Sequence, residues 1–509
     1  MEVASPAASI KPYGLTSRGP RQRQNCALNR TDRPDSQRLC LGAIVDVTTN
    51  GGHNTESLLE LMLDSLKHRG TIHEKRTLKE DGYTSILACA THKSDPPELA
   101  QSQTTAVVVD GSFYEHPECG AAEFVHERVA KSSSNLKPLK QILTEIGGFA
   151  CIIFHKKQTY AFRDVNGLRP LYYAHSKRLT AVASERKALW RVGLKNVQRI
   201  PPGYICILSK SSMKKTRVVE FKRPSERRMS IDEASANLES LLTHSIQRIT
   251  NKIGKIAVAF SGGLDSALTA ALAKRQGVKL EAVSVGLPGS PELSSVETFA
   301  QQLDLPITVE TFSSDSLEEY VRRVLWLIEE PNLMKVSVAV PLHWAAMVAA
   351  RRGCSVMLCG QGSDELYGGY AKYARILGSE GRGALVKQLY RSVIESSQVN
   401  YERDDQACAP FGVELRTPFS DLDVIRFSLT VPSKFKVKEE SDVTRKWVLR
   451  EVAKHVGLPD EITWRRKKAI QHGTGVENAI RGLAKRQGLT VDHYLLKLYE
   501  GVIRLESMP

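Results

Sequence analysis

Short apolar runs alternate with turn residues over residues 40 to about 210. The runs with the length of β-strands are "LGAIVDV", "TSILACA", "TAVVVDG", "GGFACIIFHK", "QTYAFRD", "LTAVAS" and "YICILSK". Strand-length apolar runs that are separated by turn residues are typical of β-sheets. Two helical stretches, near 54–68 and 121–145, interrupt the series. The pattern predicts an α+β domain of stacked β-sheets with helices on the outside.

From residue 255 onward, buried strands and helices are expected to alternate. "KIAVAF", "KLEAVSVGL", "ITVETF" and "SVMLCG" have the character of strands, and "DSALTAALAKRQG" and "SSVETFAQQLD" that of helices. Two further helices are expected at 316–330 and 341–352. This β–α–β rhythm predicts an α/β domain built on a doubly wound parallel sheet. After about residue 365 the pattern becomes mostly helical.

The pattern divides the chain into four segments. These are 1–39, 40–210, 211–230 and 231–509. The first contains few large apolar residues and is expected to be a disordered tail or a pro-segment, with a wrongly chosen start codon or a transit peptide as alternatives. The third is charged and polar and is expected to be a linker. It leads into a helix over 231–252, for which Ser230 is the expected N-cap.

Composition limits the range of partners. The formal net charge is +15, but lysine and arginine are spread along the whole chain, so we expect no specific nucleic-acid partner and note that a polyanionic substrate would suit this charge. The nine cysteines form no CxxC pair, which argues against zinc and favours reduced thiols in a cytoplasmic protein. No apolar run approaches the ~18 residues that cross a bilayer, so no membrane partner is expected.

A strand–turn–helix segment, "IAVAFSGGLDSALTAALA", carries the strongest chemical signal. The strand ends in Ser261, Gly262 and Gly263, and a helix starts near Asp265. Loop amides and a helix N-terminus together form an anion site for phosphate, and Asp265 can hold a Mg²⁺ ion that bridges phosphate oxygens. No Gly-Lys-Ser/Thr follows, so this is not a P-loop kinase signature. A turn that merely requires glycine is the alternative.

The segment resembles the PP-loop of the ATP pyrophosphatases, which cleave ATP between the α and β phosphates. A second motif, "GQGSDELYGGY", follows the strand "SVMLCG". Gly360 and Gly362 expose backbone at the carboxyl end of that strand, where doubly wound sheets bind ligands. Asp364 follows, where it can share a metal ion with Asp265. Together the motifs resemble asparagine synthetase; an Asp-Glu pair that caps the next helix is the alternative.

The resemblance implies a reaction and a set of contacts. ATP and Mg²⁺ would be the cofactors, and aspartate or a similar carboxylate, with ammonia or glutamine, the substrates. The carboxylate would attack the α-phosphate to give an acyl-adenylate and pyrophosphate, and ammonia would then displace AMP. Asp265 and Asp364 would hold the metal. The implied ATP contacts are Phe260, Ser261, Gly262, Gly263, Asp265, Ser266, Val285, Cys359 and Gly360.

Two segments further along extend the resemblance. "FGVELRTPFSDLDV" is similar to the family's Gly-x-Glu-x-Arg-x-Pro-Phe-x-Asp, so Glu414, Arg416 and Asp421 are implied to build the wall of the substrate site. A buried structural ion pair is an equal alternative. The segment 445–475, "RKWVLREVAKHVGLPDEITWRRKKAIQHGTG", resembles the C-terminal stretch whose lysine stabilises charge on the phosphates. By position this lysine is Lys467, with Lys468 as a neighbour that could substitute; a solvated basic helix end is the alternative.

The amino-terminal half resembles class II glutamine amidotransferases, through "LKHRG", "VVVDGSFYEH", "GGFACIIF", "RDVNGLRPLYY" and "ASERKAL". In that family an N-terminal cysteine hydrolyses glutamine, and the ammonia travels inside the protein. Cys40 is the implied nucleophile, because it precedes a strand and lies 28 positions before His68. The mechanism needs a free α-amino group with a pKa of ~8 as the base, whereas in a chain that begins at Met1 the Cys40 nitrogen is an amide.

Several family contacts are replaced in this chain. Tyr83, Asp110, Ser112 and Ala121 stand where the family has an Arg, an Asn, a Glu and an Asp around glutamine. Asp110 cannot donate a hydrogen bond to an oxyanion unless it is protonated. From these replacements we expect impaired or absent glutaminase activity. In the synthetase half, Gln361 stands where the family commonly has a glutamate that is thought to assist adenylation or ammonia attack. An amide cannot act as a base, so the identity of the carboxylate substrate stays open.

Three functions follow from these patterns. The first is ATP-dependent amide synthesis resembling that of asparagine synthetase, with Cys40, Lys467 and Gln361 at the catalytic positions. The second keeps the fold but adenylates a different carboxylate, as β-lactam synthetase-like relatives do. The third is a catalytically inactive binding protein. A homodimer is a further expectation.

Overall fold

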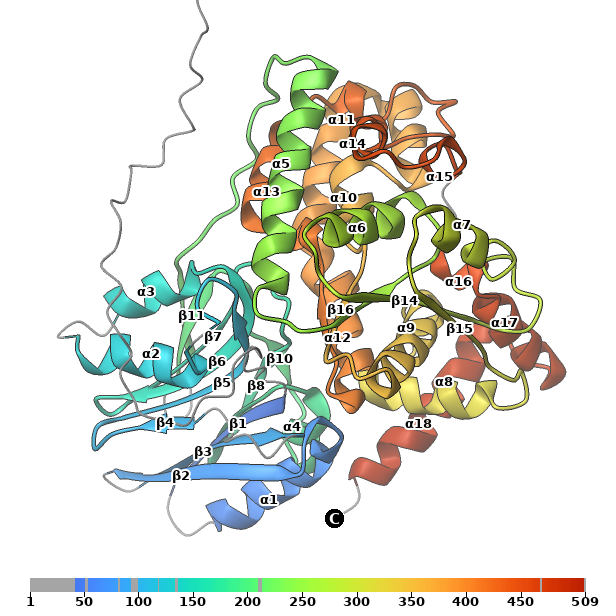
Figure 1. The fold of residues 1–509 in the computed structure, drawn as a ribbon. Coiled ribbons are helices and arrows are strands. Elements are labelled where there is room, and N and C mark those ends of the chain that lie inside the picture. Colours follow the sequence, from blue (N-terminus) through green and yellow to red (C-terminus); the bar gives the residue numbers. More distant parts are fainter. Residues whose placement is uncertain are drawn as a thin grey trace, which may run out of the picture. The chain divides into compact units, whose positions relative to one another are not determined.

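We analysed the chain in a computed structural model, which describes residues 42–50, 54–80, 83–92, 99–117, 119–132, 136–208, 213–466 and 469–507 (Figure 1). Three of the sequence predictions lie outside these residues, namely the tail 1–39, the nucleophile Cys40 and the phosphate-binding Lys467 with its neighbour Lys468.

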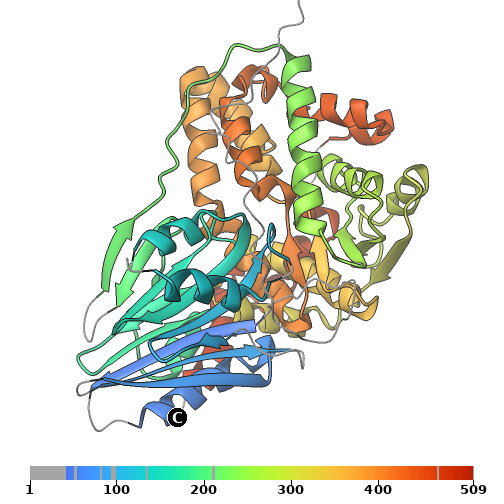
Figure 2. The same ribbon diagram turned by 60° about the vertical axis from the view of Figure 1, so that its left-hand side comes forward.

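The amino-terminal half consists of two six-stranded antiparallel sheets (Figure 2). Its elements are β1 (Gly42–Asn50), α1 (Thr55–Ser65), η1 (Lys67–Arg69), β2 (Ile72–Glu80), β3 (Tyr83–Thr91), β4 (Leu99–Gln101), β5 (Thr105–Phe113), α2 (Ala121–Ala130), α3 (Lys137–Leu143), β6 (Gly147–His155), β7 (Gln158–Arg163), β8 (Tyr172–His175), β9 (Leu179–Ala183), α4 (Arg186–Arg191), β10 (Gln198–Arg199), β11 (Tyr204–Leu208) and β12 (Met213–Arg217). The strand orders are β10-β8-β9-β1-β3-β2 and β12-β11-β7-β6-β5-β4.

Alternating side chains of the central strands build the layers. In β5, Ala106 and Val108 point into the core between the sheets, whereas Val107 and Val109 pack with α2 and α3. This follows from the two-residue period of a strand, and because both faces are covered the whole of β5 is buried. A third core, beneath α1 and α4, covers the outer face of the first sheet. The prediction of stacked sheets with helices outside is confirmed.

The four edge strands of these sheets, β2, β4, β10 and β12, were not among the predicted strands. β2 was not predicted, because its sequence "IHEKRTLKE" is charged rather than apolar. Among the described strands β2 pairs with β3 alone, at the edge of its sheet, where charged side chains remain in water and discourage pairing with another chain. The expected linker 211–230 also begins inside the fold, since its residues 213–217 form β12 against β11. Of the described residues in this segment, 218–230 lack regular structure.

The carboxyl-terminal half is built on a five-stranded parallel sheet in the order β15-β14-β13-β16-β17. Its elements are α5 (Ile231–Thr250), β13 (Ile256–Ala259), α6 (Leu264–Arg275), β14 (Leu280–Gly286), α7 (Val296–Gln302), β15 (Ile307–Thr311), α8 (Leu317–Ile328), α9 (Leu333–Arg351), β16 (Val356–Leu358), α10 (Ser363–Tyr367), α11 (Ala371–Ser396), η2 (Ser397–Tyr401), α12 (Glu402–Cys408), η3 (Ala409–Phe411), β17 (Glu414–Arg416), η4 (Pro418–Ser420), α13 (Leu422–Thr430), η5 (Ser433–Phe435), α14 (Trp447–Val456), α15 (Asp460–Thr463), α16 (Ile470–Gly473), α17 (Val476–Arg486) and α18 (Val491–Ser507). The predicted N-cap of α5 is confirmed, since Ser230 Oγ accepts a hydrogen bond from the Glu233 amide at 3.0 Å.

Helices cover both faces of this sheet, as predicted for a doubly wound fold (Figure 1). One core contains residues of α5, α6, α13 and α14, and the other contains residues of α8, α9, α17 and α18. The chain runs from β13 outward to β14 on one side and later returns to β16 on the other. The strand order therefore reverses between β13 and β16, and ligands of open α/β sheets bind at such a reversal, beyond the carboxyl ends of the strands.

Helix α9 corrects two predictions. It begins at Leu333, not near 341, because Asn332 Oδ1 accepts a hydrogen bond from the Lys335 amide at 3.1 Å and Pro341 is tolerated inside the helix. By length and composition alone α9 could cross a membrane, with a mean hydropathy of 1.5, so the statement that no apolar run approaches that length was wrong. Since 67% of its apolar window is buried inside the protein, α9 has the character of a core helix.

Buried ion pairs join residues of the two halves, and Arg69 lies at their centre. Its guanidinium contacts Glu185 Oε1 at 2.5 Å, Asp405 Oδ2 at 2.5 Å and Asp110 Oδ2 at 3.6 Å. Arg169 contacts the other oxygen of Asp405. All five side chains are buried. Because charges out of water must be paired, this cluster is stable only while its cations and anions remain matched.

We expect substitution of Arg69 by Met to destabilise the protein strongly. The substitution leaves Glu185 and Asp405 without a principal partner, and breaking a buried ion pair costs about 3–5 kcal/mol. A lower midpoint in thermal or denaturant unfolding would reveal this loss. Lys75→Met is the matched control, since Lys75 pairs with Glu56 on the surface and should leave the midpoint unchanged. Equal midpoints for both variants would contradict a stabilising role of the Arg69 cluster.

Candidate functional site

The predicted phosphate loop joins the carboxyl end of β13 to the start of α6. Gly262 has a φ of +64°, in the left-handed region that favours glycine. A Cβ atom at Gly262 would also lie 2.7 Å from the Phe299 ring. The loop is fixed by its own hydroxyl groups, since Ser266 Oγ accepts a hydrogen bond from the Ser261 amide at 3.2 Å and Ser261 Oγ accepts one from the Gly263 amide at 3.3 Å. Local hydrogen bonds therefore hold the loop at the helix N-terminus.

The second motif meets this loop at the neighbouring strand end, as the strand order requires. A Cβ atom at Gly360, just after β16, would lie 2.6 Å from the Cβ of Asp265. Only glycine permits so close an approach of the two loops. Gly362, with a φ of +92°, then turns the chain into α10, which presents Asp364. Asp265 and Asp364, predicted to share a cation, thus come from adjacent strand ends.

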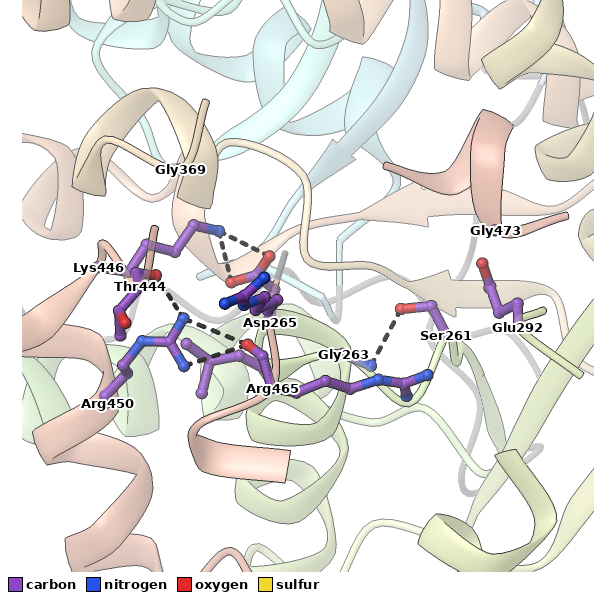
Figure 3. A pocket seen from close by; sticks show the side chains of 12 residues that line it. Ser261, Gly263, Asp265, Glu292, Gly369, Thr444, Lys446, Arg450, Arg465 and Gly473 are labelled. Atoms are coloured by element: carbon purple, nitrogen blue, oxygen red, sulfur yellow. Dashed lines mark hydrogen bonds and ion pairs between the residues drawn. The ribbon is translucent and has the colours of Figure 1, made fainter. Parts of the chain in front are cut away.

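The side chain of Lys446 lies between these two carboxylates, and Figure 3 shows its contact with Asp265. Its Nζ atom contacts both Asp265 oxygens at 2.7 Å, Asp364 Oδ1 at 2.6 Å and Ser363 Oγ at 2.8 Å. The chain reaches this point through two consecutive non-glycine residues with positive φ, Arg445 at 52° and Lys446 at 57°. Such conformations cost free energy and are held in place by their surroundings, often at functional sites.

The two carboxylates are placed to share one cation, because both lie within 2.7 Å of the same nitrogen. Among the described residues no group of three or more His, Cys, Asp or Glu side chains converges on a metal position. Mg²⁺ is commonly held by one or two carboxylates, with substrate phosphates and water as the remaining ligands. Asp265 and Asp364 therefore fit that mode of binding, provided that the Lys446 ammonium moves aside.

Basic side chains surround the cavity in front of the phosphate loop (Figure 3). The cavity has a volume of about 50 Å³, and Lys446, Arg450, Arg465 and Arg466 line it together with loop residues. Arg465 donates hydrogen bonds to the carbonyl oxygen of Gly262 at 2.9 Å and to Ser295 Oγ at 3.1 Å. A helix N-terminus and several cations around one small space favour a polyphosphate.

A larger cavity of about 530 Å³ adjoins the small one and shares Ser261 and Asp265 with it. Of the predicted site residues, Ser266, Cys359, Gly360, Gln361 and Asp364 line the larger cavity, and Ser261, Gly263 and Asp265 line the smaller. Phe260, Gly262 and Val285 are not among the described lining residues of either. Burial raises the pKa of the Cys359 thiol to about 12, so this side chain stays uncharged at neutral pH.

The residues predicted as a substrate wall lie among ion pairs instead. Arg416 contacts Glu414 Oε2 at 2.6 Å, and Arg169 contacts Glu414 Oε1 at 2.8 Å. Asp421 caps α13 by accepting a hydrogen bond from the Asp423 amide, and Arg248 contacts it at 2.6 Å. Neither cavity beside the phosphate loop counts these residues among its described lining. The arrangement matches the alternative prediction, a structural ion pair.

The positions predicted around glutamine lie on β3, β5 and α2. Asp110 is buried beside Arg69, and Ser112 donates a long hydrogen bond of 3.4 Å to Glu414. Ala121 is the first residue of α2 and is buried, and Tyr83 begins β3. Asp110 and Ser112 are thus already in contact with charged groups of the junction between the halves.

Sequence analysis did not single out Lys446, Arg450, Arg465 or Asp404, which line the two cavities. The first two lie in "RKWVLREV", and Arg465 stands two positions before Lys467. A basic cluster downstream of the second motif was therefore visible in the sequence. Its convergence on Asp265 was not, because 181 positions separate Lys446 from that residue.

Comparisons with known proteins agree with this geometry. A family model described as asparagine synthase matches residues 237–400 and 377–493, and one described as glutamine amidotransferase domain matches residues 41–215. The chain is 32% identical over 391 residues to the "Putative asparagine synthetase (glutamine-hydrolyzing) 1" of Methanocaldococcus jannaschii, a match that covers 68% of this chain and 72% of that protein. It is 26% identical over 455 residues to an asparagine synthetase (glutamine-hydrolyzing) of Zea mays, covering 82% and 75%.

Among solved structures, a glutamine phosphoribosylpyrophosphate amidotransferase from B. subtilis, complexed with ADP and GMP, aligns with 52% of this chain and 80% of its own. The TM-score is 0.32 and the identity 15%, a similarity too low to support an argument. The family model and the relative from Methanocaldococcus jannaschii are sufficient to assign the family. The chain belongs to the asparagine synthase family, with a glutamine amidotransferase domain before the synthase domain.

Proposed function

We propose that the chain is an ATP-dependent amide synthetase that converts aspartate, ATP and ammonia into asparagine, AMP and pyrophosphate through an acyl-adenylate. The observation that carries the proposal is the meeting of Asp265, Asp364 and Lys446 beside a phosphate loop at the strand reversal. The names of the relatives support aspartate as the carboxylate. The synthase domain would span residues 231–509, and the amidotransferase-like domain residues 40–210.

The phosphates of ATP are proposed to occupy the small basic cavity. The loop Ser261–Gly263 and the start of α6 would hold the β- and γ-phosphates, and Lys446 and Lys467 would neutralise charge as pyrophosphate leaves. A Mg²⁺ ion, held by Asp265 and Asp364, would supply further charge neutralisation at the phosphate oxygens. Catalysis of adenylation would then rest on positioning and on charge stabilisation.

The adenosine and the carboxylate substrate are proposed to lie beyond the phosphates. Adenine would contact the backbone of Val285 and the strand end at Cys359 and Gly360. The carboxylate would occupy the larger cavity, where Gln361 can orient it but cannot accept a proton. Since Gln361 and the large volume suit a carboxylate other than aspartate as well, β-lactam synthetase-like chemistry is the second candidate.

We further propose that free ammonia, not glutamine, is the nitrogen donor. Asp110 and Ser112 are buried next to Arg69 and Glu414, where they serve the junction between the halves. A carboxylate at position 110 disfavours an oxyanion. A cut before Cys40 would also be needed to give its thiol an α-amino base. We propose a cytoplasmic location, with a homodimer as the assembly.

Purified full-length protein should catalyse ATP–pyrophosphate exchange that depends on aspartate and Mg²⁺, and should form asparagine from ammonium but little from glutamine. Radiolabelled pyrophosphate would measure the exchange, and AMP and amino-acid analysis would measure the products.

No exchange with any carboxylate would favour an inactive binding protein, and exchange with another carboxylate would favour the second candidate. Rapid release of glutamate from glutamine would contradict a lost glutaminase, and the mass of the native N-terminus would show whether a cut precedes Cys40.

Substitution of Lys446 by Met should lower the rate of aspartate-dependent exchange by about 10²–10³-fold, because one preorganised charge at a developing anion has that effect. Steady-state exchange kinetics would measure it. Lys454→Met is the matched control: Lys454 lies on α14, the helix that Lys446 immediately precedes, but it is exposed and pairs with Glu451. Equal exchange rates for the two variants would exclude a role of Lys446 in adenylation.

A further inference from the structure

The larger cavity has an open end and a buried end. Met334 and Val399, at the open end, are 42% and 36% exposed. Asp404 and Arg403, from α12, are each 2% exposed and line the same cavity. Small polar species from solvent can therefore reach a space that is bounded by buried charged groups. The carboxylates that line this space differ in what occupies their oxygens.

Three of these carboxylates already have a cation beside them. Asp265 and Asp364 contact the Lys446 ammonium at 2.7 and 2.6 Å. Glu395, on α11, is exposed and lies 3.6 Å from Arg391. Ammonia, the nucleophile of amide synthesis, is present at neutral pH mainly as the ammonium cation. Asp265, Asp364 and Glu395 do not need this cation, because each already has a positively charged partner.

Asp404 also has a cation beside it, Arg403, but it is buried and one of its two oxygens has no described hydrogen-bond donor. Arg403 contacts Asp404 Oδ1 through Nε at 2.7 Å and Nη2 at 2.6 Å. The second oxygen, Oδ2, is buried and accepts no hydrogen bond from any described residue. A buried carboxylate oxygen without a donor is rare and costly, and a bound cation would satisfy it.

Glu365 provides a second oxygen of this kind in the same cavity. Its Oε1 accepts hydrogen bonds from Tyr370 Oη at 2.7 Å and Asn400 Nδ2 at 2.8 Å, whereas Oε2 is buried without a described partner. Glu365 lies close enough to Asp404 to act on its titration. Burial first, and then the Glu365 and Asp405 carboxylates, raise the pKa of Asp404 to about 6, and Arg403 opposes the shift.

We propose that Asp404 binds the ammonium ion in the larger cavity and accepts its proton during amide formation, with Glu365 as the second oxygen contact. The proposal rests on the proposed function and supplies the base that Gln361 cannot be. It also gives ammonium a direct entry from solvent, since the open end of the cavity is in the synthase domain.

The step balances as follows. Bound ammonium transfers one proton to Asp404 Oδ2 and becomes ammonia, whose nitrogen lone pair attacks the acyl carbon of the acyl-adenylate. The C–N bond forms, the bond between the acyl carbon and the phosphate oxygen breaks, and AMP leaves with that electron pair. The second proton leaves with the departing phosphate. Asp404 returns its proton to water before the next turnover. A carboxylate with a pKa near 6 is ionised at neutral pH and is a stronger base than an ordinary Asp.

The test compares nucleophiles in the full-length protein and its Asp404→Asn variant, which preserves the shape of the side chain. Aspartate-dependent ATP–pyrophosphate exchange without ammonium should be unchanged. The kcat/KM for ammonium should fall at least about 100-fold, the usual loss when a general base is removed. Hydroxylamine is uncharged at neutral pH and needs no proton removed before it attacks, so hydroxamate formation should be preserved. Asp404→Glu should recover part of the ammonium activity.

Glu451→Gln is the control, because it removes a carboxylate of the synthase domain that pairs with Lys454 and is not among the described lining residues of either cavity; all three measurements should stay unchanged. Loss of ammonium and hydroxylamine activity together in Asp404→Asn would make the role of Asp404 structural and overturn the proposal. Unchanged use of ammonium would overturn it as well. No exchange in the unsubstituted protein would reject the proposed function itself, a result distinct from both.

Discussion

The site of this protein depends on one buried ammonium group that holds two strand-end loops together. Without the Lys446 ammonium, Asp265 and Asp364 would face each other as like charges at the reversal of strand order. Each loop reaches this point only because glycine permits it. A Cβ atom at Gly360 would meet Asp265, and one at Gly369 would lie 1.8 Å from Asp364 Oδ1. Close backbone approach and charge neutralisation are therefore two aspects of one constraint.

The same constraint explains how the site can be assembled before any ligand arrives. The Lys446 ammonium holds the two carboxylates close together. If these carboxylates hold the proposed Mg²⁺ ion, that ion would take the place of the ammonium, and the flexible lysine side chain could then reach the phosphates instead. The backbone at Arg445 and Lys446, in the left-handed region, fixes the base of that side chain.

The fold was predictable from sequence where local periodicity decides the structure. The alternation of β5 between two cores, the N-cap at Ser230 and the β–α–β rhythm are local properties. β2 and the start of α9 were missed because tertiary pairing outweighs local composition at a charged edge strand, and an upstream cap at Asn332 outweighs Pro341. The loops of the site were predictable from glycine and aspartate spacing. The place of Lys446 between them, and the burial of Asp404, depend on contacts between segments far apart in the chain.

Glu414 and Arg416 illustrate a limit of motif analysis. Their string was predicted either as a substrate wall or as a structural ion pair, and the three-dimensional arrangement shows ion pairs, with Arg169 contributed by the other half. The motif indicates that Glu414 and Arg416 interact, but it does not indicate where in the fold the pair lies. Asp110 is a second example. Sequence analysis predicted it to be a defective contact for glutamine, and in the structure it lies beside the guanidinium of Arg69.

The cluster around Arg69 limits which substitutions related chains can accept. One guanidinium serves carboxylates at 110, 185 and 405, from three separate segments, so none of these positions can change its charge alone without leaving a buried partner uncompensated. Single substitutions at this junction therefore pass through unstable intermediates, and related chains are expected to keep or replace the four residues as a block. At such a junction, a change of charge at one position is tolerated only together with a compensating change at another.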